Sequence, residues 1–90
     1  MGLTTAQFTL NPTTPTKIIG KDTNPQRCIV HCHEHGNNPQ IFVGNQTVTA
    51  TTGLHIPNGL NIEIILNPND ELYAIASGDS PVVHVLVQEF

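Results

Sequence analysis

Hydrophobic and polar residues alternate in short stretches along this chain, and turn-forming residues separate the stretches. The alternation is clearest near the end, where Val83, Val85 and Val87 occupy every second position. A period of two places successive side chains on opposite faces of a β-strand. This pattern and the many β-branched residues predict short strands at Ala6–Leu10, Thr16–Gly20, Cys28–His35, Ile41–Val43, Thr47–Thr49, Ile62–Leu66, Leu72–Ala76 and Val82–Val87.

No stretch of the chain predicts a helix. An apolar stripe with helical spacing is never sustained for about three turns, because Pro or Gly interrupts every long candidate. Clusters of Asn, Pro, Gly and Asp between the strands favour tight turns. We therefore expect an all-β fold: a single small antiparallel β-sandwich over residues 1–90, either a jelly roll or immunoglobulin-like, with about seven or eight short strands. Residues 1–5 are expected to form a flexible N-terminal arm.

The alternation also predicts which side chains are buried. Ile62, Ile64 and Leu66 should face the core. In the last strand the valines at positions 83, 85 and 87 share one face, whereas the opposite face mixes apolar and polar residues, as expected of a strand half covered by a neighbour. The hydrophobic strand that runs to Phe90 would be an edge that needs cover, which favours self-association or docking.

Composition and charge exclude two classes of partner. The formal net charge is -4, and only Lys17, Lys21 and Arg27 carry fixed positive charge, so the clustered cations of a nucleic-acid binder are missing. No apolar run approaches the ~20 residues of a membrane span, so no membrane interaction is predicted.

The first residues lack the features of a secretory signal, which predicts a protein made in the cytoplasm. Two cysteines four residues apart on one strand are too distant for a disulfide, so free thiols are expected.

The candidate chemistry is concentrated between Cys28 and His35. On a strand, Cys28, Val30 and Cys32 would face the core, and three histidines, His31, His33 and His35, would face outward. Two histidines at positions i and i+2 can converge on one zinc or iron ion. The outer two are about 13 Å apart on a straight strand, so a complete site would need further ligands. These could come from His55, His84 or Glu63, or from equivalent histidines around a trimer axis.

Three interpretations of this histidine row are open. The favoured one is the polar face of a half-buried strand, with no metal and no cofactor. The second is a metal site built on His31, His33 and His35. The third is a subunit interface whose contacts change when the histidines take up protons.

A small metal-dependent enzyme of the cupin type is the catalytic alternative. Cupins present His-x-His, a carboxylate a few residues later and a late histidine. Here His33-Glu34-His35 is followed by Gln40 where a glutamate is needed, and Pro57-Asn58-Gly59 resembles the second motif without its histidine. No phosphate loop, nucleophile elbow or other catalytic constellation is present. We therefore predict no catalytic residues and no enzymatic activity.

Several turn-and-strand motifs resemble those of small virion structural proteins of tailed bacteriophages. They extend over most of the chain, from about Thr13 to Val87. The matching segments are Asn24-Pro25-Gln26-Arg27 leading into a strand, Asn38–Gly44, Val48–Gly59, and Glu71–Gly78 followed by a hydrophobic strand. The histidine row departs from this resemblance, because such proteins usually carry Asn, Thr and Gly at those positions.

The resemblance implies a compact β-sandwich bound to a phage particle. It implies a capsid decoration, or cement, protein that bridges capsid subunits, with a tail or neck component as the alternative. The implied partners are the major capsid protein or other virion proteins, and further copies of the chain, with a trimer favoured. The implied location is the virion, after synthesis in the host cytoplasm. A threonine- and asparagine-rich surface with few charges suits many polar contacts that salt does not screen.

Overall fold

The computed structural model describes residues 3–32, 40–57, 59–78 and 81–89. These residues form two four-stranded sheets in which every neighbouring pair of strands is antiparallel. The strands are β1 (Leu3–Thr9), β2 (Thr16–Ile19), β3 (Gln26–Cys32), β4 (Ile41–Gly44), β5 (Leu54–Ile56), β6 (Asn61–Leu66), β7 (Leu72–Ala76) and β8 (Val82–Glu89). The strand order is β1-β8-β3-β6 in sheet A and β2-β7-β4-β5 in sheet B.

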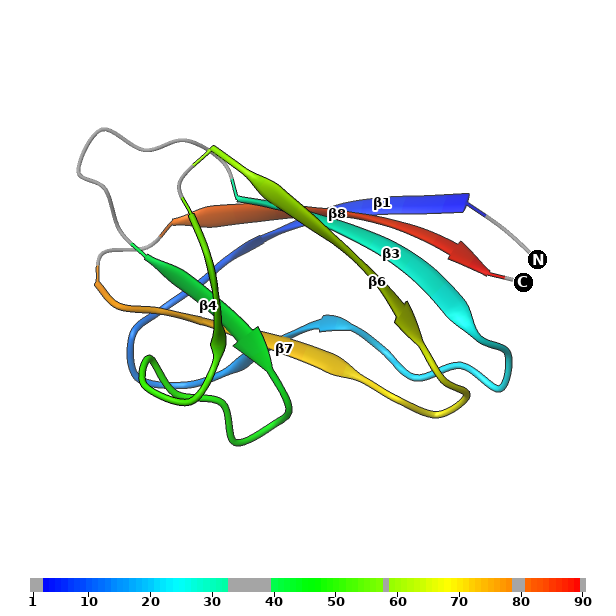
Figure 1. The fold of residues 1–90 in the computed structure, drawn as a ribbon, viewed down its shortest axis with the longest axis horizontal. Coiled ribbons are helices and arrows are strands. Elements are labelled where there is room, and N and C mark those ends of the chain that lie inside the picture. The colour runs from blue at the N-terminus through cyan, green and yellow to red at the C-terminus, as the bar shows by residue number, and fades with distance from the viewer. Residues whose placement is uncertain (1–2, 33–39, 58, 79–80, 90) are drawn as a thin grey trace.

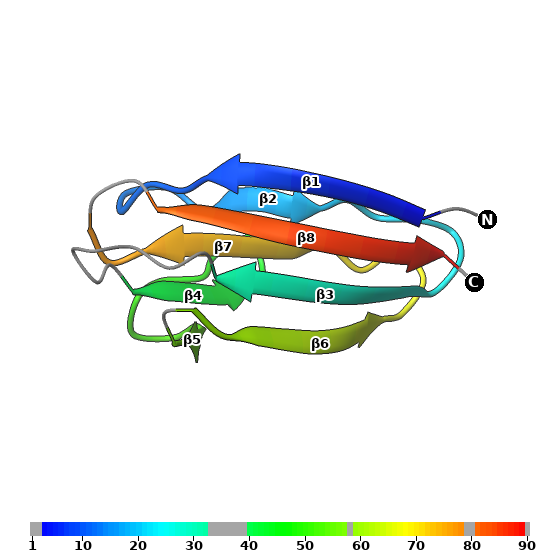
Figure 2. The same ribbon diagram turned by 90° about the horizontal axis from the view of Figure 1, so that it is seen from above.

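The two sheets lie face to face as the layers of a β-sandwich (Figure 1). The view from above shows sheet A in front of sheet B (Figure 2). The first and last strands pair in sheet A, and the second and seventh pair in sheet B. This order is that of a jelly roll. The prediction of a small all-β sandwich is confirmed, and of the two expected topologies the structure adopts the jelly roll.

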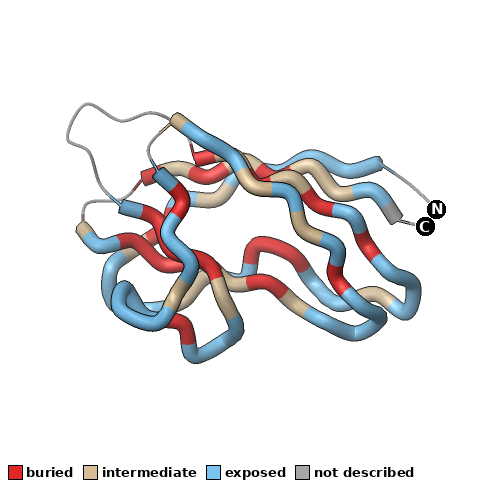
Figure 3. The backbone as a smooth tube through the Cα atoms, in the orientation of Figure 1, coloured by how far each residue is buried: buried red, intermediate tan, exposed pale blue. Residues whose placement is uncertain are grey.

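The core consists of apolar side chains that pack between the sheets. Buried positions occur along strands of both sheets (Figure 3). The largest fully buried side chains include Leu10, Ile41, Ile56, Val30 and Val83. Among the described residues, Gln26 is the polar side chain that is buried, and its Nε2 donates a hydrogen bond to the carbonyl oxygen of Gly20 at 2.9 Å. That bond removes the cost of burying an unpaired amide.

The predicted burial pattern is confirmed in sheet A. Cys28, Val30 and Cys32 are buried against the core, and Ile62 and Ile64 pack against it from β6. In β8 the even and odd positions separate as predicted, because Val83 and Val85 are buried whereas Val82, His84 and Leu86 are only half-buried. The expectation that the last strand is an edge is wrong, because β8 lies between β1 and β3. His31 lies on the outward side of β3, whereas His33 and His35 lie outside the described residues.

The prediction of a strand at Thr47–Thr49 is wrong. This segment is part of a loop held by local hydrogen bonds: the Val48 N–H donates to the Asn45 carbonyl oxygen at 3.0 Å, and the Thr47 N–H donates to Asn45 Oδ1 at 3.0 Å. Threonine and valine favour strands only where a neighbour offers a ladder, and here the Asn45 side chain offers the backbone a turn instead. The strand of this region is the later β5, which pairs with β4.

The prediction of a flexible arm over residues 1–5 is also wrong for residues 3–5. These residues belong to β1, where Leu3 is opposite Gln88 and Thr5 is opposite Leu86. Most side chains of β1 are exposed, so the sequence shows little of the hydrophobic pattern of a strand. These residues form a strand because their backbone pairs with β8, which is long enough to pair with all of β1.

Candidate interaction surface

The face of sheet A that points away from sheet B, called here the outer face of sheet A, is built from three rows of side chains that cross all four strands. Opposite residues on antiparallel strands share a face, so the register defines each row. In order across β1, β8, β3 and β6, the rows are Leu3-Gln88-Arg27-Ile65, Thr5-Leu86-Ile29-Glu63 and Gln7-His84-His31-Asn61.

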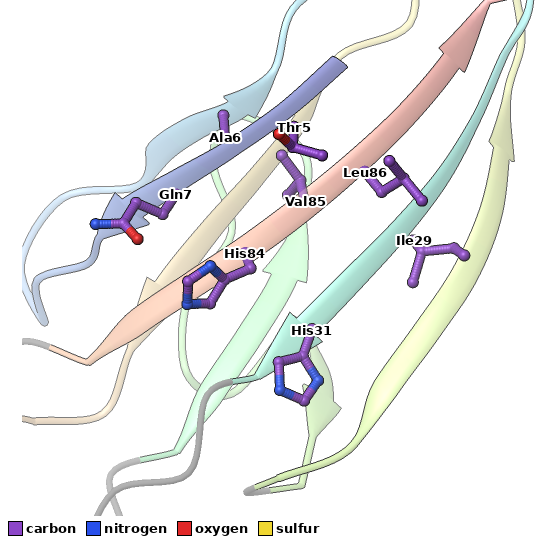
Figure 4. A pocket seen from close by; sticks show the side chains of 8 residues that line it. All are labelled: Thr5, Ala6, Gln7, Ile29, His31, His84, Val85 and Leu86. Carbon is purple, nitrogen blue, oxygen red and sulfur yellow. The ribbon is translucent and has the colours of Figure 1, made fainter. Parts of the chain in front are cut away.

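The third row brings two histidines together. His31 on β3 is directly opposite His84 on β8, with ring centroids 6.3 Å apart and ring planes inclined by 45°. Both side chains are half-buried. Figure 4 shows the two rings projecting from neighbouring strands on the same side of the sheet. From the sequence, His84 was one of several residues that could lie near the histidine row. The strand register shows that it lies opposite His31.

An open depression of about 460 Å³ lies over these rows. Thr5, Gln7, Ile29, Leu86 and the two histidines contribute to its lining (Figure 4). It combines an apolar floor at Ile29 and Leu86 with polar side chains along one side. This mixture of apolar centre and polar surroundings is typical of protein interaction surfaces.

Two exposed apolar side chains extend this surface toward the sheet edges. Leu3 on β1 is 70% exposed and Ile65 on β6 is 63% exposed. Both belong to the first row, in which Arg27 lies beside Ile65. The Arg27 guanidinium forms an ion pair with Glu63, so the fixed charges on this part of the face neutralise one another. The ion pair is half-exposed and contributes little to stability.

The equivalent face of sheet B is partly covered by the chain itself. Val48, from the loop between β4 and β5, packs against Phe42, Ile75 and Tyr73. Gly53 allows this loop to lie close to the sheet, because a Cβ atom built there would be 2.7 Å from Phe42 Cβ. His55 is on this side of the molecule, with its ring 5.1 Å from that of Phe42. The predicted candidates His31 and His55 are therefore on different sheets.

The two cysteines are buried core residues. Burial raises the pKa of the Cys28 thiol, and it also raises the pKa of the Cys32 thiol. A thiol held in its protonated form is a poor nucleophile and a poor metal ligand. Both cysteines are free, as the spacing predicted.

Pro57 and Gly59 of the sequence motif Pro57-Asn58-Gly59 lie between β5 and β6, and Asn58 is outside the described residues. The Leu60 N–H donates to the Pro57 carbonyl oxygen at 3.0 Å, and Gly59 has a φ of 82°. A positive φ at the third position of a β-turn favours glycine, so the turn accounts for this motif without a ligand. No group of three or more His, Cys, Asp or Glu side chains that could hold a metal ion occurs within the described ranges.

The structure contains no helix, within the residues it describes, of the length and apolarity that crossing a membrane requires. No family model matches the chain, and no curated protein matches it. Among solved structures, a chain of the Bacillus endospore appendages, described as a novel family of disulfide-linked pili, has a TM-score of 0.61 and 9% sequence identity. That match covers 99% of this chain and 86% of the appendage chain.

The Dit protein of SPP1, described as a paradigm of the hub adsorption apparatus in phages that infect Gram-positive bacteria, has a TM-score of 0.49 and 12% identity. The match covers 98% of this chain and 49% of the Dit chain. At 9% identity the similarity to the appendage chain concerns the fold alone.

Proposed function

We propose that this protein is a non-enzymatic structural component of a tailed-phage particle, a capsid decoration protein that stabilises the head by bridging capsid subunits. The observation that carries the proposal is the contrast between the two outer faces. The loop of Val48 packs over Phe42 and Ile75 of sheet B, whereas no described segment packs over the mixed apolar and polar rows of sheet A. The motifs that resemble small virion proteins supply the phage context.

The physical basis of such a role is burial of surface across a joint between subunits. A protein that binds the assembled shell and not its separated subunits stabilises the shell by mass action. The outer face of sheet A suits this role because it is a rigid, hydrogen-bonded platform with Ile29 and Leu86 at its centre. Its partner would be the major capsid protein or another virion protein.

The proposal that the protein has no enzymatic activity is supported by the interior of the sandwich. The space between the sheets is occupied by side chains such as Leu10, Ile41 and Ile56, each fully buried. Two departures from the cupin motifs agree with the absence of enzymatic activity. Gln40 stands where a glutamate is needed, and no histidine follows Gly59 as the second motif requires.

We also propose that the protein assembles as a homo-oligomer, with a trimer favoured. Several copies around a symmetry axis would bind a symmetric shell with an avidity above that of one copy. The exposed side chains of Leu3 and Ile65 at opposite edges of sheet A provide apolar area for such contacts.

Mass-spectrometric copy counting in purified particles tests the proposal. A decoration protein should be present in hundreds of copies, in a fixed ratio to the major capsid protein, because it repeats with the capsid lattice. A count of about a dozen or fewer would instead assign the protein to the tail or neck, where ring symmetry limits the number. Particles that lack the protein altogether would contradict any virion role.

A further inference from the structure

We propose that His31 and His84 form a two-histidine binding site for a divalent transition-metal ion of the zinc and nickel class. The proposal does not depend on the proposed function. It rests on the cross-strand register, which places the two side chains directly opposite each other on β3 and β8. It differs from the metal site considered from the sequence, which was built on His31, His33 and His35 and had His84 as one of several possible further ligands.

The separation of the two rings suits a shared ion. A metal–nitrogen distance of about 2.0–2.1 Å holds two imidazole centroids roughly 5–6 Å apart. The observed centroid separation is 6.3 Å, so small side-chain rotations bring one nitrogen of each ring within ligating distance. The backbone needs no movement, because both residues lie within the paired parts of their strands. Such preorganisation lowers the entropic cost of binding.

The surroundings of the pair favour a cation. Gln7 and Asn61 flank the two histidines in the same row, and their amide oxygens are further possible ligands. The nearest fixed positive charge on this face is Arg27, four residues before His31 along β3, and it is paired with Glu63. The depression above the rings is open, so an ion can reach the half-buried nitrogens and retain water in its remaining positions.

The ligand type sets the selectivity. Imidazole nitrogens suit zinc, nickel and copper, whereas magnesium and calcium require oxygen ligands. We therefore expect one Ni²⁺ or Zn²⁺ ion per chain and no comparable binding of Mg²⁺. Nickel and zinc are the better probes, because the thiols of Cys28 and Cys32 could reduce copper(II) in any unfolded fraction.

The test is chelator competition with Ni²⁺ and with Zn²⁺ at neutral pH on the full chain. His31→Gln and His84→Gln should each weaken binding by at least about tenfold, because each removes one arm of a chelate. His55→Gln is the matched control and should bind as the wild type does, since this histidine lies over sheet B. Thermal unfolding without metal establishes that each variant folds.

A second measurement identifies the ligands even if one variant folds poorly. Paramagnetic Ni²⁺ should broaden the imidazole NMR signals of His31 and His84 in the wild-type chain and leave those of His55 sharp. The proposal is overturned if neither ion binds, if Mg²⁺ binds equally well, or if both pair variants retain wild-type affinity. It is also overturned if the His33→Gln, His35→Gln double variant abolishes binding while the His31 and His84 variants do not.

Discussion

His31 and His84 are cross-strand partners on the two central strands of sheet A, with ring centroids 6.3 Å apart. The two residues are distant in sequence and are brought together because β3 and β8 are neighbours in the jelly roll. Within the described part of this face, the histidine that lies beside His31 therefore comes from another strand. The strand alternation that separates neighbouring side chains also aligns those of adjacent strands.

Two fixed like charges at this pair should destabilise the fold. Like charges directly opposite on a sheet cost about 0.2–1 kcal/mol. We expect the His31→Lys, His84→Lys double variant to lose more stability than the sum of the two single variants, because only the double variant places two ammonium groups on opposite residues. Urea unfolding of the wild type, the two single variants and the double variant measures this.

A His31→Lys, His55→Lys double variant is the control, because His55 lies beside Phe42 on sheet B and its charge cannot face that of residue 31. The two single effects should add in this control. Additive effects in the His31→Lys, His84→Lys double variant as well would contradict the prediction.

The sequence predicts the faces of the strands well, for a simple physical reason. Alternation is local, so Cys28, Val30 and Cys32 could be assigned to the core, and Ile62 and Ile64 to the same side, before any strand order was known. The short apolar segments and the turn residues between them were sufficient to predict an all-β sandwich.

The sequence could not predict the contacts that depend on strand order. The pairing of His31 with His84 follows from the neighbourhood of β3 and β8, which no local pattern encodes. The loop over sheet B was missed because Val48 and its threonine neighbours have the composition of a strand, and only tertiary packing against Phe42 distinguishes the two states. The early start of β1 was missed because its exposed side chains carry no hydrophobic pattern.

Gly53→Ala should destabilise the protein by about 1–3 kcal/mol, the usual cost of overpacking. The new Cβ would lie 2.7 Å from Val48 Cγ2 and 2.7 Å from Phe42 Cβ, so the loop would have to lift from sheet B. Gly20→Ala is the matched control and should be nearly neutral, since no atom lies within 4 Å of the added carbon. Denaturant unfolding of the two variants measures the difference. Equal stability would show that the loop adjusts freely.

The buried thiols predict a loss of stability in alkali. Burial raises the pKa of Cys28 and of Cys32 above the ordinary value of 9.0. In the unfolded chain both thiols ionise first, so above about pH 9 the unfolded state binds fewer protons and stability falls as pH rises. A Cys28→Ala, Cys32→Ala double variant should lose less stability between pH 8 and pH 10 than the wild type does.

The same burial should slow the reaction of both thiols with a disulfide reagent in the native protein. Because both side chains are fully buried, labelling requires opening of the sandwich. The labelling rate should rise steeply with urea, and two thiols should react per chain once the protein is unfolded. Fast labelling of either cysteine in native buffer would contradict the packing of β3.

Self-association through the outer face of sheet A can be tested with two matched exposed residues. Ile65 on β6 is 63% exposed, and Leu54 on β5, an edge strand of sheet B, is 61% exposed. Ile65→Asp should weaken the oligomer, because burying an unpaired carboxylate in an interface is costly. Leu54→Asp should leave the oligomer unchanged. Neither substitution should unfold the protein, because both side chains are exposed on edge strands. Sedimentation equilibrium of the three proteins over a range of concentrations measures this. A wild-type chain that stays monomeric would contradict the homo-oligomer, and loss of assembly only in Leu54→Asp would place the contact on sheet B.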